Sequence, residues 1–186
     1  MIASAEGYID IARDLIQSGA NINATDVDGI TAIQKAVVRG NTEVAKLLID
    51  HKAEMKQVDT IGNTLLHRAV QSGYIDIVKL LISLGSNINN KSMILSTPIH
   101  ETVNNGHLNV VKLLIDMGVN VNQQDISGCT PLYYAVKNRY TDLVALLISV
   151  GADVKAVNND GKTLLDLARE KGYDDIVELL IKDYTE

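Results

Sequence analysis

Apolar residues recur along the chain at the spacing of short amphipathic helices, and the second quarter of the sequence shows the pattern clearly. The Asp-Thr-Ile-Gly-Asn segment at 59–63 predicts a tight turn, because Asp closes turns through its side chain and Gly tolerates positive φ. Thr64 is a suitable N-cap for a helix over 65–72, and Gly73 permits a left-handed stop. A second helix over 75–84 follows, with a wide apolar face.

The same pattern returns every 33 residues, which indicates a stacked repeat array. Threonine holds the helix-start position five times, at Thr31, Thr64, Thr97, Thr130 and Thr163. Glycine and leucine columns keep the same step. This frame gives one partial copy and five complete copies, which we expect to form a single domain over 1–186. Their bounds are 1–25, 26–58, 59–91, 92–124, 125–157 and 158–186.

Each predicted helix is shorter than the roughly 12 to 15 residues that an isolated helix needs in water. Stability must therefore come from packing between neighbouring copies. We expect one leucine column of the second helices to form the centre of the stack, namely Leu47, Leu80, Leu113, Leu146 and Leu179. On this basis Leu113→Ala costs about 2 to 5 kcal/mol.

The third complete copy carries the most specific motif. It has Ser-Thr-Pro-Ile-His at 96–100, Gly-His-Leu-Asn-Val-Val-Lys-Leu-Leu-Ile at 106–115, and then Gly118 and Val121-Asn122. This closely resembles the ankyrin repeat, and the resemblance covers nearly the whole chain. It implies an all-α solenoid of stacked helix-turn-helix units with short β-hairpin-like turns.

The resemblance also implies that a histidine after the helix start ties neighbouring turns together. His67 and His100 occupy that column, and Gln34, Tyr133 and Asp166 replace them in the other copies. Three further positions depart from the glycine columns, Lys52, Leu95 and Arg139. Since leucine is strained at positive φ, we expect the turn at 92–96 to adopt a different shape.

Composition excludes several classes of function. The chain has 186 residues, 46% hydrophobic, with a net charge of -6, so the clustered cations that bind nucleic acid or anionic membranes are not expected. Its longest apolar run, 143–148, is far below the roughly 20 residues of a membrane span. With no secretory signal pattern and one cysteine, we expect a monomeric, intracellular, cytoplasmic protein.

No catalytic, cofactor or metal site is predicted. His67 and His100 stand one repeat apart, too far to share a zinc ion whose bonds are near 2 Å. Cys129 precedes Thr130 in a turn where we expect exposure, but no histidine base lies in its repeat. Residues 160–163, Asp-Gly-Lys-Thr, lack the upstream glycine of a phosphate loop.

The resemblance implies a concave partner-binding face made of turn tips and the exposed sides of the first helices. Contiguous exposed apolar residues often mark interfaces, and tyrosine is a frequent anchor, so we expect Tyr134 to act as one. The alternative is that the apolar turn residues fold back over the neighbouring turn. The candidates at the turns are Ile30, Ile61, Asn63, Met93, Ile94, Ile126 and Cys129. Those on the helices are Lys35, Arg68, Gln71, Glu101, Asn104, Tyr134, Lys137 and Asn138.

The function expected from this resemblance is that of a non-enzymatic module that binds a partner protein. An alternative is a targeting or substrate-recognition segment of a larger enzyme or of a bacterial effector acting in a host cell, which the incomplete first copy favours. A third possibility is a selected or engineered binder. The irregular columns at Lys52, Leu95 and Arg139 argue against a consensus design.

Overall fold

The structure is a computed structural model that describes residues 1–184. These residues form twelve α-helices and no β-strand, with isolated bridges only at Thr25–Thr31 and Val157–Thr163. The chain divides into two compact units, Met1–Asn87 (unit 1) and the residues from Ile88 onward (unit 2). The 33-residue frame runs through both.

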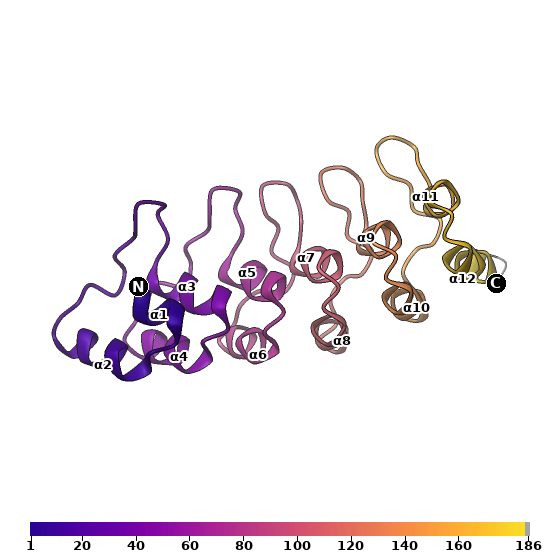
Figure 1. Cartoon of the computed structure of the whole chain (residues 1–186). Helices are drawn as coiled ribbons and strands as arrows, with labels where there is room; N and C mark the ends of the chain where they lie inside the picture. The colour runs from indigo at the N-terminus through magenta and orange to yellow at the C-terminus, as the bar shows by residue number, and fades with distance from the viewer. Residues whose placement is uncertain (185–186) are drawn as a thin grey trace. The chain divides into compact units, whose positions relative to one another are not determined.

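Unit 1 contains three helix pairs. The first helices of the pairs pack in one row and the second helices in another, while the turns before α3 and α5 project on the same side (Figure 1). The helices are α1 (Ile2–Glu6), α2 (Ile9–Gln17), α3 (Ala32–Arg39), α4 (Thr42–Asp50), α5 (Leu65–Ser72) and α6 (Ile75–Ser83).

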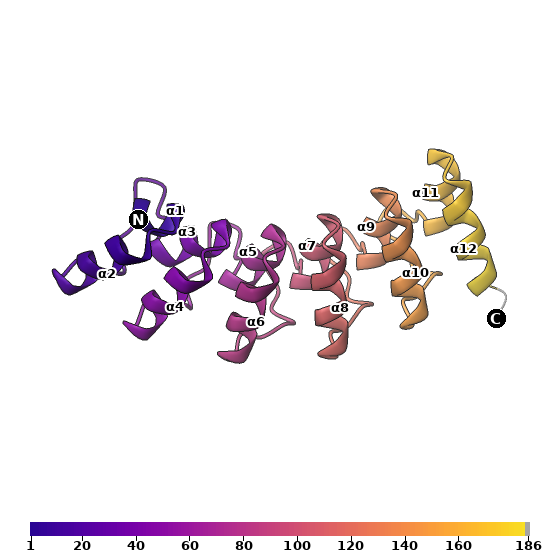
Figure 2. The same ribbon diagram turned by 60° about the horizontal axis from the view of Figure 1, so that its bottom comes forward.

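Unit 2 repeats the arrangement. Its first helices, α7, α9 and α11, pack in order, and each is followed by its second helix (Figure 2). The helices are α7 (Pro98–Asn104), α8 (Leu108–Asp116), α9 (Pro131–Lys137), α10 (Thr141–Ser149), α11 (Leu164–Lys171) and α12 (Asp174–Tyr184).

The threonine column caps the first helices, and the residue three positions later completes most of the caps. Gln34, His67, His100 and Asp166 each accept a hydrogen bond from the threonine backbone N–H. Because His100 Nδ1 accepts from Thr97 N–H, its Nε2 carries the proton and donates to the Cys129 carbonyl at 3.2 Å. The expected histidine tie between neighbouring turns is thus present within unit 2.

The core leucines are not the column that the sequence analysis selected. Leu47, Leu80, Leu113, Leu146 and Leu179 are only half-buried. The adjacent column is at most 3% exposed and contains Leu48, Leu81, Leu114, Leu147 and Leu180. The two columns lie on the same apolar stripe, one residue apart, so periodicity alone did not distinguish its centre from its edge.

The turn around Leu95 keeps the common shape, so the expected change of shape is wrong. Ser92 N–H donates to Ser96 O at 2.8 Å, which matches the bond between Asp59 and Asn63 at 3.0 Å. Leu95 takes φ 56°, and Lys52 and Arg139 likewise stand at positive φ. The Leu95 side chain is 43% exposed, so it can occupy this conformation without entering the packed interior.

Candidate partner-binding surface

An aspartate at the start of the turn organises three of the repeats. One carboxylate oxygen, Oδ1, accepts two backbone N–H groups from within the turn. For Asp26 these belong to Asp28 and Ile30, at 3.0 and 2.9 Å. Asp59 and Asp125 repeat this pattern at 2.8 to 3.0 Å. Side-chain closure of this kind fixes the turn without help from a strand.

The second oxygen of each of these aspartates holds the side chain nine residues later on the first helix. Lys35 Nζ lies 2.7 Å from Asp26 Oδ2, and Arg68 pairs with Asp59 Oδ2. In unit 2 the Tyr134 hydroxyl donates to Asp125 Oδ2 at 2.6 Å. Lys35, Arg68 and Tyr134 were all predicted as contact residues, and in the structure they are fixed in place before any partner arrives. We call them the held donors.

These contacts shift the titration of the groups involved. The hydrogen bond from Lys35 is the largest cause that lowers the pKa of Asp26. Burial acts to raise the pKa of Asp59, but the Asn63 and Ile61 amides and the Arg68 charge outweigh it, so the net shift is downward. Burial and then the hydrogen bond to Asp125 raise the pKa of Tyr134. The Asp26 and Asp59 carboxylates are therefore ionised and the Tyr134 hydroxyl is neutral at neutral pH.

The copy at 92–124 inverts the arrangement. Ser92 replaces the aspartate, and the position nine residues later is Glu101, which is not a donor. Glu101 instead accepts a hydrogen bond from the Ser96 hydroxyl at 2.9 Å. Both members of the pair differ from the other repeats, so a half-buried carboxylate takes the place of the donor here.

Unit 1 has a hollow of about 290 Å³ on the side of its first helices. Three predicted candidates, Ile30, Lys35 and Arg68, line it, together with Ala5, Gln34, Val38, Arg39 and Asp59. Val38 is 43% exposed, and Arg39 is exposed and makes no ion pair within residues 1–184. An apolar wall beside an unpaired guanidinium can accept an aliphatic or aromatic side chain flanked by a carboxylate.

In unit 2 the predicted helix residues contact one another. The Lys137 ammonium lies 5.6 Å from the centre of the Tyr134 ring, and the His100 ring meets the same tyrosine edge-on at 6.2 Å. Asn138 Nδ2 donates to both Asn104 oxygens at 3.1 Å. In unit 1, Arg68 similarly donates to Gln71 at 2.9 Å.

The turn tips are apolar and exposed in both units. Ile61 is 44% exposed, and in unit 2 Met93, Ile94 and Ile126 are 71%, 43% and 56% exposed. The Ile126 N–H donates to the Ile94 carbonyl at 2.9 Å. The two turns are therefore joined through their backbones, while the side chains of Ile94 and Ile126 remain exposed to solvent. Ile30 is half-buried at the edge of the hollow.

Comparison with known proteins decides the family. The sequence model described as Ankyrin repeats (3 copies) matches residues 1–92 and 99–186. The chain belongs to the ankyrin repeat family. Among solved structures, that of the human ASB11 ankyrin repeat domain is similar: it is 28% identical, the match covers 97% of this chain and 81% of that chain, and the TM-score is 0.85. No curated protein matches the chain.

The predicted all-α ankyrin-repeat solenoid is thus confirmed, and ankyrin repeats generally serve as protein–protein interaction modules. No helix among the described residues has the length and apolar character needed to cross a membrane.

Two predicted contact residues of this ankyrin chain are buried, so the exposure expected for Cys129 is wrong, and partner contact at both positions stays a prediction. Asn63 and Cys129 are only 4% and 5% exposed. Both occupy the last turn position, where the backbone N–H bonds to the turn aspartate and the chain turns into the helix. Burial raises the pKa of the Cys129 thiol to about 11, with the Asp125 charge as the next cause. The thiol is therefore protonated and unreactive at neutral pH.

The sequence analysis missed Val38 and Arg39, although the ankyrin frame contained the signal. Val38 shares a column with Gln71, Asn104 and Lys137, all of which were selected, and Arg39 shares the column of Asn138. Both residues line the hollow in unit 1. The turn tip Val27 is also fully exposed, in the column of Met93 and Ile126.

Proposed function

We propose that this ankyrin repeat protein is a non-enzymatic module that binds a partner protein through the turn tips and the exposed side of the first helices. One observation supports this placement above the others: the three held donors, Lys35, Arg68 and Tyr134, share a column with exposed apolar turn tips beside it. Fixed polar groups next to apolar surface are the usual composition of a specific protein interface.

The state of two side chains near the start of α9 favours a binding role there over nucleophilic chemistry. The thiol of Cys129 is buried and protonated, and its neighbour Tyr134 has a raised pKa. Neither group is prepared for nucleophilic attack at neutral pH, because a nucleophile needs a lowered pKa or an adjacent base.

The hollow in unit 1 indicates the chemistry of one contact. Val38 and Ile30 offer an apolar wall, and Arg39 offers an unpaired cation at its edge. We expect a partner side chain that is aliphatic or aromatic to enter here, with an acidic residue beside it to pair with Arg39.

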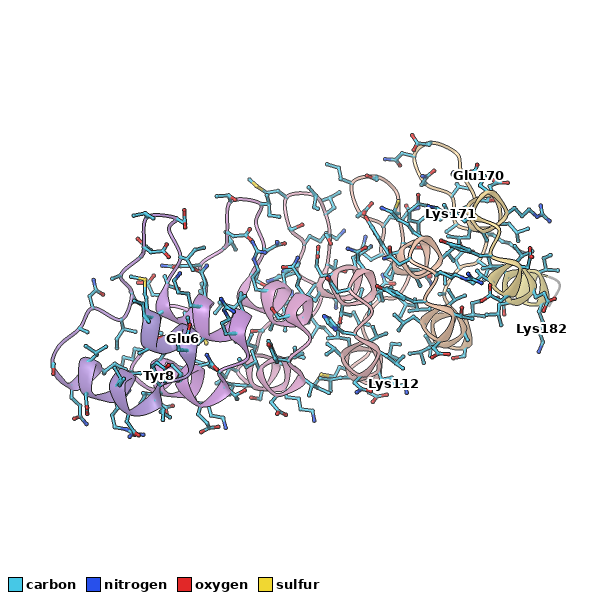
Figure 3. All side chains as sticks on the ribbon, in the orientation of Figure 1. Glu6, Tyr8, Lys112, Glu170, Lys171 and Lys182 are labelled. Carbon is cyan, nitrogen blue, oxygen red and sulfur yellow. The ribbon has the colours of Figure 1, made fainter. Side chains whose placement is uncertain are left out.

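Affinity capture with purified wild-type chain, followed by titration of the captured protein in purified form, tests the proposal. Tyr134→Ala and Ile61→Asp together should weaken binding by at least about 100-fold, since each hot spot is worth about 2 kcal/mol or more. Lys112→Ala is the matched control, because Lys112 is exposed on the second helix α8, away from the first helices (Figure 3).

If the double variant and the wild type bind the captured protein with equal affinity, and circular dichroism shows unchanged helicity, the proposed placement of the interface is wrong. Loss of binding in Lys112→Ala alone would instead move the interface to the second helices.

A further inference from the structure

One repeat of unit 2 has a carboxylate at the position that carries a held donor in three other copies. This residue is Glu101 on α7, nine positions after the start of its turn. The turn aspartate has changed as well, to Ser92, whose hydroxyl is buried and makes no hydrogen bond with the described residues. The turn aspartates contact the residue nine positions later, so an aspartate at this point would stand beside a second anion. With serine there, the turn supplies no charge to Glu101.

The Glu101 side chain is held in place, but its charge is not neutralised. The hydroxyl of Ser96, a residue only 4% exposed, donates to Glu101 Oε1 at 2.9 Å. The other oxygen, Oε2, makes no hydrogen bond with the described residues and is not a buried atom, so solvent reaches it. Glu101 forms no ion pair within residues 1–184. The fold therefore presents a positioned carboxylate whose second oxygen is open to a partner.

Aromatic and apolar groups accompany this carboxylate. Burial is the largest cause that raises the pKa of Tyr134 on the neighbouring α9, and the charge of Glu101 acts in the same direction. Lys137 on α9 lies over the Tyr134 ring at 5.6 Å and forms no ion pair with Glu101. Met93 and Ile94, in the turn that bonds to Glu101, are 71% and 43% exposed. A cation on an apolar stem matches such surroundings.

We propose that Glu101 is a specificity-determining residue that pairs with a lysine or arginine of the partner protein, next to an aliphatic or aromatic partner residue at the Met93 and Ile94 turn tip. This inference rests on the proposed function and adds the sign of one contact, opposite to that expected at Arg39 in unit 1. A carboxylate that is already positioned loses little further freedom when it pairs. An acidic partner segment is repelled at the same point, which adds to the selectivity.

Selection of peptides from a random library displayed on phage tests the inference, with the purified wild-type chain, Glu101→Gln and Glu101→Lys as separate targets. Peptides selected on the wild type should carry a lysine or arginine beside an aliphatic or aromatic residue at least about fivefold more often than the unselected library. This preference should disappear on Glu101→Gln and turn toward Asp and Glu on Glu101→Lys. Glutamine keeps an acceptor for the Ser96 hydroxyl, so the turn is preserved.

Glu178→Gln is the matched control, because it removes the same charge from an exposed glutamate on the second helix α12. The selected peptides, titrated in purified form, should bind Glu101→Gln at least about fivefold more weakly than wild type and bind Glu178→Gln unchanged. The chain has a net charge of -6. Equal weakening in the two variants would show general attraction to this charge and would overturn the inference, as would a selection on the wild type without a basic preference.

Tyr134→Ala distinguishes this inference from the proposed function. Peptides that lose affinity for Tyr134→Ala but not for Glu101→Gln bind the proposed surface without the contact to Glu101, and then only the inference fails. Peptides that bind both variants as well as the wild type bind elsewhere, and then the proposed function fails as well.

Discussion

The Tyr134 hydroxyl and the Asp125 carboxylate form a hydrogen bond of 2.6 Å that joins helix α9 to the turn that precedes it. Asp125 is 7% exposed, and its other oxygen already bonds the Ser127 and Cys129 amides. Tyr134 therefore provides a donor to the second oxygen of a buried carboxyl group, while its ring stays half-buried at the surface.

Tyr134→Phe should destabilise the fold by about 1 to 3 kcal/mol, because it leaves a buried carboxylate oxygen without its donor. Urea unfolding followed by circular dichroism measures this difference. Tyr133→Phe is the matched control: Tyr133 is also half-buried on α9, but no hydrogen bond of its hydroxyl links it to Asp125. Equal effects of the two substitutions would contradict the role given to the hydroxyl.

His100→Gln should flatten the pH dependence of stability between pH 7 and 5. Burial lowers the pKa of His100, so the folded protein keeps the ring neutral while the unfolded chain takes up a proton near the ordinary value of about 6.5. Stability is thus lost as pH falls through that value, and it levels off below the folded pKa. Glutamine keeps the cap acceptor, as Gln34 does in its own repeat.

The readout is the free energy of unfolding at several pH values. His51→Gln serves as the control for the exchange of histidine for glutamine, since the His51 ring is exposed. An unaltered slope in His100→Gln would show that this ring does not carry the pH dependence.

Leu114→Ala should cost about 2 to 5 kcal/mol, whereas Leu113→Ala should cost about 1 kcal/mol. Leu114 is 0% exposed and Leu113 is half-buried, although both sit on α8 and are adjacent in sequence. Chemical denaturation measures the free energy of unfolding of each variant, and the two values can be compared directly because the same leucine-to-alanine change is made at both sites. The reverse order of costs would mean that the packing described for α8 is wrong.

Lys52→Gly should stabilise the protein by up to about 1 kcal/mol, because lysine at φ 64° carries the left-handed penalty that glycine avoids. Lys52 is exposed, so no packing is lost. Thermal melts of Lys52→Gly and Lys52→Ala separate the backbone effect from removal of the charge. Stabilisation by alanine as well as by glycine would point to the charge instead.

The sequence predicted the helices well because the turn residues mark their ends. The helix over 65–72 agrees with α5 at both ends, and the second helix ends one residue earlier than expected, at Ser83. The Thr64 cap and the Gly73 stop depend on the residue type at one position, so they can be predicted from the sequence. How deeply a side chain is buried depends on packing with the neighbouring copies. The predicted leucine column therefore lay one residue away from the buried one.

The sequence analysis selected residues for the candidate surface but did not predict the contacts that they make with the turn aspartates. Lys35, Arg68 and Tyr134 were selected as outward-facing residues, yet their shared spacing of nine residues from Asp26, Asp59 and Asp125 went unused. Asn63 and Cys129 are buried because one turn position separates an exposed tip from the start of the helix, a difference in depth that the sequence does not show.

The pairing of Asp59 with Arg68 has a consequence for partner selection. An incoming carboxylate cannot simply neutralise Arg68, because it must first displace an anion that the fold itself supplies. The same internal competition shields Lys35. If the proposed surface binds a partner, an acidic ligand without a matching apolar group would therefore gain little affinity from Lys35 or Arg68. Arg39, which makes no ion pair within residues 1–184, would instead favour a ligand that also fits the apolar wall.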